Sequence, residues 1–209
     1  KIQAKVQADF EKWMLDNDIS SAAVRSSSTY EDTKESSFAG QFKTILNVRN
    51  GVDLVKALRE VLAAEPSQTY SDKKGIVNAV VQEFIEPDIA GVIFSVNPAS
   101  GKNEFVINTS EGRGTNVVEG GKAEQYFVDR LNIENITHKG ERELLSSRQI
   151  KELATIAFRI ELLFEMPQDI EWAIKNNVLY VLQARPITRI SHLHLWDSSN
   201  ISESFPGIV

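Results

Sequence analysis

Two neighbouring strand patterns near the carboxyl end constrain what this 209-residue chain can fold into more than any other feature. Residues 169–175 and 178–185 have the composition of strands, and the pair Asn176-Asn177 separates them. The sequence therefore predicts an antiparallel hairpin that turns at these two asparagines.

One face of this hairpin is predicted to carry polar side chains suited to a metal ion and to phosphate. Alternate residues of a strand share a face, so Asp169 lies with Glu171, and Gln183 with Arg185. Carboxylate and amide oxygens suit Mg²⁺, and an arginine provides a fixed fork for phosphate oxygens. A second interpretation stays open: an ordinary solvent-exposed face, with Glu171 and Arg185 as a cross-strand ion pair.

The register of the hairpin distinguishes these two interpretations. A plain two-residue turn pairs Glu171 with Leu182 and sends Gln183 to the opposite face. A metal site needs Glu171 opposite or diagonal to Gln183, which requires a three-residue loop or a bulge. We predict this odd register, and a plain two-residue turn with no bulge would contradict the metal site.

The rest of the chain predicts an α+β fold. Helices are expected at residues 1–18, after Asn50 with Val55, Leu58 and Leu62 as the buried face, and after a Ser146–Gln149 capping box, where Ile150, Leu153, Ala154, Ala157, Ile160 and Phe164 are buried. Strands are expected at residues 44–48, 78–85, 91–96, 104–107 and 125–128, and the second of these is nearly continuously apolar, as in a strand buried on both faces. The polar stretch that ends at Gln41 is predicted to be a loop. No regular strand–helix–strand alternation is present, which disfavours a doubly wound sheet.

The three histidines and the aromatic residues of the helices are assigned no role in a site. His138 is expected to be exposed in a polar stretch, and His192 and His194 lack an evident third metal ligand. The aromatic residues of the helices are expected to belong to the core: Phe10, Trp13, Phe158 and Phe164.

Composition excludes several classes of protein. The chain has no cysteine, which excludes a disulfide scaffold, cysteine-ligated zinc, iron–sulfur clusters and thiol catalysis. Its net charge of −6 argues against binding to nucleic acid or to an anionic membrane. The sequence contains no apolar run long enough for a membrane span and nothing like a signal peptide, so a cytoplasmic protein is expected. The length suits one large domain or two small lobes, and the first residue, Lys1, suggests a fragment of a longer chain.

Several blocks, in order along the chain, carry a family resemblance: residues 24–29, 31–32, 37–41, 44–48, 80–85, 91–98, 169–174 and 179–188. They resemble the nucleotide-binding domain of phosphoenolpyruvate synthases, and pyruvate phosphate dikinases and rifampicin phosphotransferases carry related blocks. The resemblance covers roughly residues 20–190. It implies an ATP-grasp fold, with an antiparallel or mixed sheet and flanking helices, in which ATP lies between two lobes.

The resemblance implies roles in phosphate and metal binding. Glu171 and Gln183 match the Glu and Gln that hold Mg²⁺, and Asp169 is assigned to orienting the metal or its water. Arg185 and Arg25 match arginines that contact phosphate oxygens, and they are the expected catalytic residues.

The resemblance also implies how the nucleotide is held. The loop containing Gly40 is expected to close over the phosphates as a lid. The adenine is expected to bind to the backbone of the segment made by Gln82, Glu83, Phe84 and Ile85.

The resemblance implies an ATP-dependent phosphotransferase. The intact protein is expected to pass a phosphoryl group from Mg-ATP to a histidine on another domain of the same chain. Residues 1–190 would form the larger, carboxyl-terminal part of the ATP-grasp region. Residues 191–209 would form a linker toward further domains. Related enzymes carry a further segment ahead of the region that begins at Lys1, and this sequence does not include it. The glycine loop reads Glu111-Gly112-Arg113-Gly114, where the family usually has Gly-Leu-Gly-Glu. The fragment alone is therefore expected to be inactive. An antibiotic (rifampicin-type) phosphotransferase and a non-catalytic docking module are the alternatives.

Overall fold

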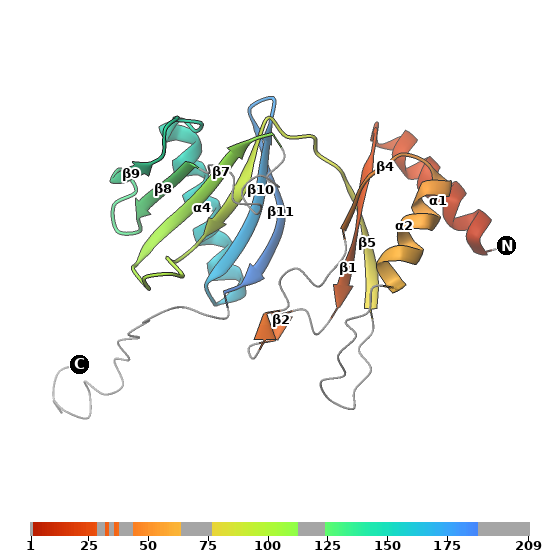
Figure 1. Cartoon of the computed structure of the whole chain (residues 1–209), viewed down its shortest axis with the longest axis horizontal. Helices are drawn as coiled ribbons and strands as arrows, with labels where there is room; N and C mark the ends of the chain where they lie inside the picture. Colours follow the sequence, from red (N-terminus) through yellow and green to blue (C-terminus); the bar gives the residue numbers. More distant parts are fainter. Residues whose placement is uncertain are drawn as a thin grey trace. The chain divides into compact units, whose positions relative to one another are not determined.

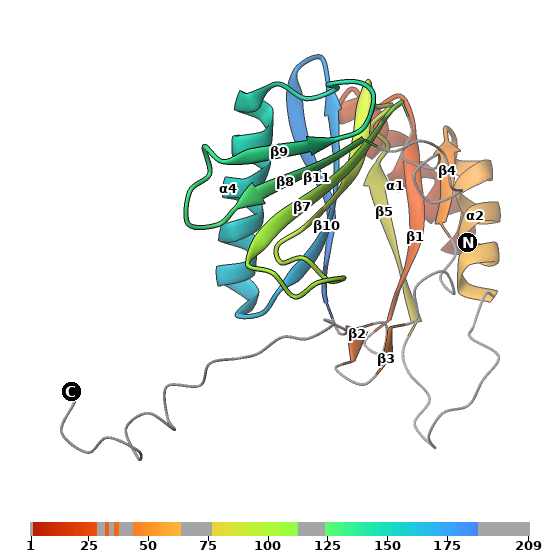
Figure 2. The same ribbon diagram turned by 60° about the vertical axis from the view of Figure 1, so that its left-hand side comes forward.

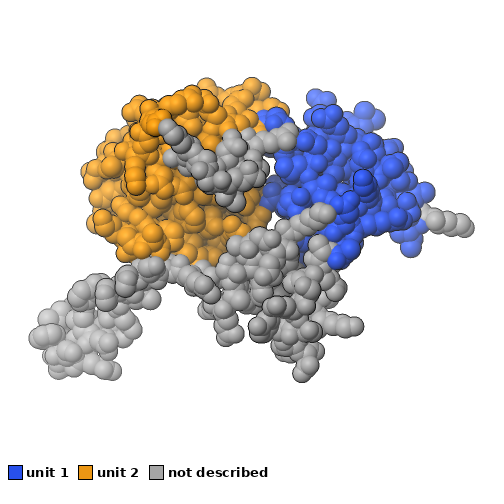
Figure 3. All heavy atoms as spheres, in the orientation of Figure 1, with its two compact units in different colours: residues 1–86 blue, residues 87–209 orange. Residues whose placement is uncertain are grey.

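A computed structural model describes residues 2–28, 32–33, 36–37, 44–63, 77–112 and 124–187. The chain divides into two compact units, Lys1–Glu86 and Pro87–Val209 (Figure 3). Each unit has its own antiparallel sheet and its own hydrophobic core. The α+β fold class predicted from the sequence is confirmed.

Unit 1 is a three-stranded sheet covered on one face by two helices (Figure 1). Its elements are α1 (Ile2–Asp16), β1 (Ala22–Ser28), β4 (Thr44–Val48), α2 (Gly51–Ala63) and β5 (Val77–Glu83), with the two-residue strands β2 (Asp32–Thr33) and β3 (Ser36–Ser37) paired separately. The strand order is β4-β1-β5. Val24 at the centre of β1 is fully buried, since it packs against residues of both helices in one core.

A bulge in β4 lets an irregular stretch of sequence face this core. Ile45 and Val48 both belong to the core although they are three residues apart, which a regular strand does not allow. The pairing with β1 shifts register between Ala22 and Val24, and Asn47 has a φ of 61°. Asparagine tolerates this left-handed conformation, so the extra residue fits into β4.

Unit 2 is a six-stranded antiparallel sheet with one long helix on one face (Figure 2). Its elements are β6 (Ile89–Phe94), β7 (Glu104–Glu111), β8 (Glu124–Asp129), β9 (Ile136–Lys139), α4 (Ser147–Phe164), β10 (Gln168–Lys175) and β11 (Val178–Pro186). The strand order is β11-β10-β6-β7-β8-β9. The other face of the sheet, which we call the open face, carries the side chains that alternate with the core residues.

Local sequence explains why α4 begins where it does and where it packs. The Ser146 hydroxyl oxygen accepts a hydrogen bond from the Gln149 N–H, and Gln149 Oε1 accepts one from the Ser146 N–H, which forms the predicted capping box. Beneath the helix, strand β6 requires glycine at position 91. A Cβ there would lie 2.0 Å from the carbonyl oxygen of Asn108 in the neighbouring strand β7. The helix and the sheet therefore meet over a core centred on Trp172 and Leu153.

An ion pair fixes the carboxyl half of α4 to the edge of the sheet. The Arg130 guanidinium donates to both carboxylate oxygens of Glu161, at 2.9 and 2.7 Å. The same guanidinium lies over the Phe105 ring, 5.0 Å from its centroid. Both charged side chains are largely buried, so the pair is shielded from solvent.

Several sequence predictions about burial were wrong. Strand β5 is not buried on both faces, since Val80 is 44% exposed. Among the described strands it pairs only with β1, so it also lies at an edge of the sheet. The buried face of α2 consists of Gly51, Leu54, Ala57 and Val61, while Leu62 is 43% exposed. Phe158 and Phe164 of α4 are exposed because they lie on its outer side.

Two further predictions were wrong about local structure. His138, which was expected to be exposed in a polar stretch, belongs to β9 and is half-buried. The predicted loop up to Gln41 contains the small ladder of β2 and β3. Residues 38–43, 113–123 and 188–209 lie outside the described residues, and with them Gly40, most of the glycine-rich loop and the predicted linker. In the part of the chain that is described, no helix has the length and apolar character of a membrane span.

Candidate functional site

The β10–β11 hairpin has the odd register that the sequence predicted. Lys175 pairs with Val178 across a two-residue turn, yet Glu171 pairs with Gln183. The register shifts between Glu171 and Trp172, which makes Leu182 an extra residue in β11. The predicted bulge is thus confirmed, in combination with a two-residue turn.

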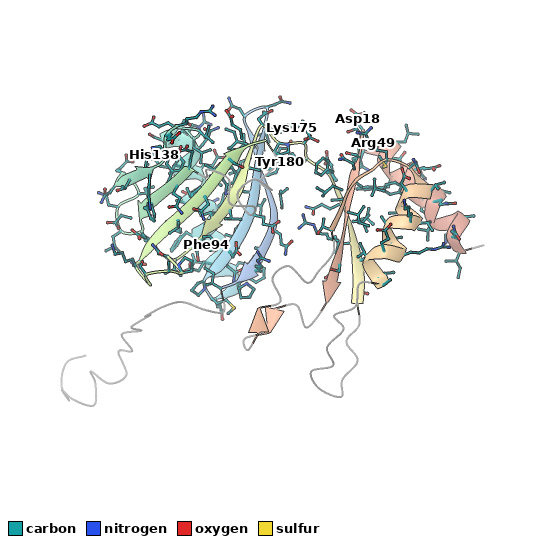
Figure 4. The ribbon with its side chains drawn as sticks, in the orientation of Figure 1. Asp18, Arg49, Phe94, His138, Lys175 and Tyr180 are labelled. Atoms are coloured by element: carbon teal, nitrogen blue, oxygen red, sulfur yellow. The ribbon has the colours of Figure 1, made fainter. Side chains whose placement is uncertain are left out.

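The turn itself follows from its two asparagines. Asn176 and Asn177 have φ angles of 51° and 64°. Positive φ at both central residues is the type I′ geometry, which matches the twist of the flanking strands and favours asparagine. The turn end of the hairpin, at Lys175, and the opposite end of the neighbouring strand, at Phe94, are labelled in Figure 4.

The hairpin presents its polar residues on the open face of unit 2. Ile170, Trp172 and Ile174 of β10 are all buried in the core beneath α4. Because side chains alternate along a strand, Asp169 and Glu171 point to the other face. The bulge in β11 brings Gln183 and Arg185 to this same face, opposite Glu171 and Asp169.

Asp169 and Arg185 form an ion pair at the centre of this group. Arg185 Nε donates to Asp169 Oδ2 at 2.9 Å, and the Asp169 side chain is only 15% exposed. The pair fixes the plane of the guanidinium beside Glu171 and Gln183. The second carboxylate oxygen, Asp169 Oδ1, is buried without a hydrogen-bond partner in the described structure.

The donor set fits a hard divalent cation that brings further ligands with its substrate. A buried, unpartnered carboxylate oxygen costs free energy unless water or a cation satisfies it. The cross-strand pair Glu171–Gln183, which lies close to the Asp169–Arg185 pair on the same face, adds side-chain oxygen atoms that can ligate a metal ion. Among the described residues, no cluster of three His, Cys, Asp or Glu side chains could hold a metal by itself. Mg²⁺ is typically bound by one or two carboxylates together with substrate phosphates and water, so the residues present fit it.

The open face also carries a polar pair that the sequence analysis missed. Glu171 pairs with Val92, and Val92 pairs with Asn108, so the three side chains lie in one row across the sheet. Gln125 Nε2 donates to Asn108 Oδ1 at 2.8 Å, and both residues are half-buried. The signal for Asn108 was a polar residue directly after the apolar run of β7.

In unit 1, Arg25 lies on the sheet face opposite the helices. Its neighbour Val24 is in the core beneath α1 and α2, so Arg25 points the other way. Arg25 pairs with Val80 of β5 and with Thr44 of β4. This face therefore combines one guanidinium with exposed apolar surface at Val80.

The backbone at the end of β5 offers hydrogen-bonding groups at the side of the sheet. The Phe84 N–H donates to the Ser21 carbonyl at 2.9 Å. Antiparallel pairs alternate between bonded and non-bonded positions, and Glu83 pairs with Ala22 between two bonded positions. The N–H and C=O of Glu83 therefore point away from β1, toward the side where the described residues place no further strand.

The predicted site residues are thus found in two groups. Asp169, Glu171, Gln183 and Arg185 lie together on unit 2. Arg25 and the segment Gln82, Glu83, Phe84 and Ile85 lie on unit 1.

Comparison with known proteins gives the family of the chain. Residues 1–140 and 122–199 match the model of the pyruvate phosphate dikinase AMP/ATP-binding domain. A probable phosphoenolpyruvate synthase of Methanocaldococcus jannaschii is 34% identical over 85% of this chain and 18% of its own length. The phosphoenolpyruvate synthase of Pyrococcus furiosus is 32% identical over 80% of this chain and 26% of its own length. The prodigiosin synthesizing transferase PigC of Serratia marcescens is 32% identical over 82% of this chain and 23% of its own length.

The chain spans only 18 to 26% of the length of these relatives. The similarity nevertheless extends over both units, since the matched ranges run from residue 1 to residue 199. On this evidence the chain belongs to the family of pyruvate phosphate dikinase AMP/ATP-binding domains.

Proposed function

We propose that this chain binds Mg-ATP as part of a phosphoenolpyruvate synthase-type phosphotransferase. The intact protein would pass a phosphoryl group from ATP to a histidine on another domain of the same chain. The observation that carries the proposal is the bulge at Leu182, because it puts Gln183 opposite Glu171 beside the Asp169–Arg185 pair. A solvated outer face has no need of this register. The reaction uses ATP, so we expect a cytoplasmic protein.

On unit 2, the chain would hold the charged end of the nucleotide. Glu171 and Gln183 would hold Mg²⁺, and Asp169 Oδ1 would orient the ion or its water. Bound Mg²⁺ would supply positive charge that neutralises the phosphate oxygens. Arg185, whose plane is fixed by Asp169, would direct its guanidinium to the phosphates. Catalysis of this kind consists mainly of positioning and charge neutralisation.

On unit 1, the chain would bind the base and contribute a second arginine. The outward carbonyl of Glu83 would accept from the exocyclic amine of adenine, and its N–H would donate to a ring nitrogen. The Phe84 N–H already donates to the Ser21 carbonyl. Within the predicted segment, the adenine would therefore bind to the backbone of Glu83 and Ile85. Arg25 would contact phosphate oxygens from the face that carries Val80.

The final acceptor of the phosphoryl group is determined outside this region. The relatives include phosphoenolpyruvate synthases and a prodigiosin synthesizing transferase, so proteins with different reactions share this part of the chain. A rifampicin-type phosphotransferase would use the same residues named here. Assays of the intact protein with pyruvate and with candidate antibiotics would distinguish the two.

Calorimetric titration with ATP, with and without Mg²⁺, tests the proposal on this chain and on the intact protein. We expect Glu171→Gln to weaken Mg-ATP binding about tenfold or more, which corresponds to ~1.4 kcal/mol. The matched control is Glu143→Gln, which removes the same charge from an exposed position on unit 2 and is expected to change nothing. Full Mg-ATP affinity and full phosphoryl transfer in Glu171→Gln would overturn the metal assignment. If neither protein binds ATP, the docking-module interpretation replaces this one.

A further inference from the structure

Asp88, the second residue of unit 2, holds three segments together. Its N–H donates to the Ile174 carbonyl at 2.9 Å, at the end of β10. Its carbonyl accepts from the Gly112 N–H at 2.8 Å, at the end of β7. Its carboxylate oxygen Oδ2 accepts from the Asn176 N–H at 2.8 Å, inside the β10–β11 turn. The first two bonds use only backbone atoms, so the side chain serves the turn alone.

The two strands of the hairpin differ in length by one residue. Strand β10 has eight residues and β11 has nine, although both ends of the hairpin are paired. At the open end, the Ile187 N–H donates to the Pro167 carbonyl at 2.9 Å. At the turn end, Asp88 binds Asn176. One extra residue must therefore lie somewhere between these ends of β11.

The extra residue has two places where it can be accommodated. In the structure it is Leu182, next to Gln183, and Ala173 pairs with Tyr180. If the turn opened to three residues, the extra residue would move into the turn and Ala173 would pair with Val181. Glu171 would keep its partner, but the strand beside Gln183 would become straight. A bulge bends its strand and increases its twist, so its loss would change the direction of the Gln183 side chain.

The other side of the turn is held less tightly. Gln149 Nε2 donates to Asn177 Oδ1 at 3.3 Å, a long side-chain contact at an exposed position. Leu179 also opposes the change, since it packs against the core of unit 2 and would turn to the open face. The Asp88 carboxylate, in contrast, binds a backbone N–H of the turn directly.

We propose that Asp88 is a positioning residue for the metal-binding face of the hairpin. By accepting the Asn176 N–H, it keeps the turn at two residues and the extra residue of β11 next to Gln183. The proposal rests on the proposed function in assigning Mg²⁺ to Glu171 and Gln183. The position of the bulge itself is independent of any ligand.

The first readout is structural and needs no nucleotide. Cross-strand NMR contacts of Ala173 report the position of the bulge, because its partner is Tyr180 in the structure and Val181 after the shift. We expect Asp88→Ala to show both partners, and the wild-type chain and Asp88→Asn only Tyr180. Asparagine keeps an oxygen that can accept the Asn176 N–H, so it is the conservative rescue.

The second readout is the dependence of ATP binding on Mg²⁺. We expect Asp88→Ala to reduce the Mg²⁺-dependent gain in ATP affinity by less than about fivefold, the ceiling that the loss of one ordinary hydrogen bond sets, with metal-free binding unchanged. The matched control is Asp129→Ala, which removes an equivalent bond: Asp129 Oδ1 accepts from the Leu131 N–H at 2.8 Å in the β8–β9 turn. This control is expected to leave the gain unchanged.

The outcomes separate the two proposals. If Asp88→Ala keeps only the Ala173–Tyr180 contact, the positioning role is overturned. An unchanged Mg²⁺-dependent gain in Asp88→Ala, with ATP binding intact, overturns it as well. If no variant and no wild-type protein binds ATP, the proposed function fails, while the Ala173 contacts still decide whether Asp88 sets the bulge.

Discussion

Gln183 lies directly opposite Glu171 across the β10–β11 ladder, although only two residues connect the two strands. A two-residue turn alone would have put Leu182 in that place and turned Gln183 toward the helix. The extra residue at Leu182 reverses the alternation for the rest of β11. The pairing of the two side chains, on which the metal proposal depends, is thus a consequence of one bulge.

Cross-linking tests this register directly. In the structure Asp169 pairs with Arg185, whereas a hairpin without the bulge would pair it with Ala184. We expect the double variant Asp169→Cys/Arg185→Cys to form a disulfide under mild oxidation, because opposed residues meet the distance requirement. The matched pair Asp169→Cys/Ala184→Cys should stay reduced, since its side chains point to opposite faces. The chain contains no cysteine, so mass spectrometry reads each cross-link without background.

Deletion of Leu182 separates the pairing from the geometry of the bulge. Without this residue β11 has the length of β10, and Gln183 can still pair with Glu171 in a regular ladder. We expect the deletion variant to fold with a circular dichroism spectrum like that of the wild-type chain. Its strand would lack the local bend, so we expect Mg²⁺-dependent ATP binding to weaken several-fold. Calorimetry that showed unchanged Mg-ATP affinity would mean that the pairing alone is sufficient.

The Arg130–Glu161 pair predicts a large effect on stability. Its two side chains are 14% and 19% exposed, so removing one partner leaves a largely buried charge. We expect Glu161→Ala to lower the free energy of unfolding of unit 2 by about 2–3 kcal/mol. Urea unfolding followed by Trp172 fluorescence, with Trp13 and Trp196 replaced by Phe, measures this value.

An exposed ion pair on the same helix is the control for that experiment. Lys151 binds Glu134, whose side chain is 69% exposed. Exposed pairs contribute about 0–1 kcal/mol, so Glu134→Ala should change the urea midpoint little. Equal losses in Glu134→Ala and Glu161→Ala would show that burial does not explain the effect.

A buried carboxylate predicts how stability depends on pH. Burial raises the pKa of Glu124, but hydrogen bonds from His138 and from the backbone N–H groups of Glu141 and Arg142 outweigh it, and the pKa lies below its ordinary value of 4.5. A lowered pKa means that this carboxylate stabilises the fold above the ordinary value and that the contribution is lost as the pH falls below it.

The comparison with Glu124→Gln checks this sign. We expect the wild-type chain to lose stability more steeply than the variant below pH 4.5, the ordinary value for this carboxyl group. Above that pH the Glu124 carboxylate is ionised in both the folded and the unfolded state, so its contribution to the difference in unfolding free energy no longer changes with pH. If the unfolding free energies of the wild type and of Glu124→Gln fell in parallel through the acid range, the lowered pKa of Glu124 would be contradicted.

Prediction from the sequence succeeded where the signal was local. The capping box at Ser146 and the turn at Asn176-Asn177 depend on residues within a few positions of each other. Asn50 was also correctly identified as a cap, since its side chain accepts from the Asp53 N–H at 2.9 Å. Caps and turns are determined by short-range hydrogen bonds and backbone preferences, and these are readable from neighbouring residues.

Prediction failed where burial depends on distant neighbours. The apolar pattern of β5 suggested cover on both faces, but Val80 is exposed because it lies on the face of the sheet opposite the helices. His138 was expected to be exposed in a polar stretch, yet it pairs with Glu124 at 2.8 Å and stacks on Tyr126. The cover of a strand's face comes from other elements of the fold, and no pattern within the segment itself contains that information.

The sequence by itself determined where the hairpin turns, at Asn176-Asn177, and that a metal site on one of its faces needs an irregular register. In the structure Leu179 and Ala184 both pack against the core of unit 2 although they are five residues apart, which a regular strand does not allow. Only the tertiary structure decided that the irregularity is a bulge at Leu182 and not a longer turn. Asp88 lies far from the hairpin in the sequence and binds the turn from outside it, and under our proposal this contact keeps the extra residue at Leu182.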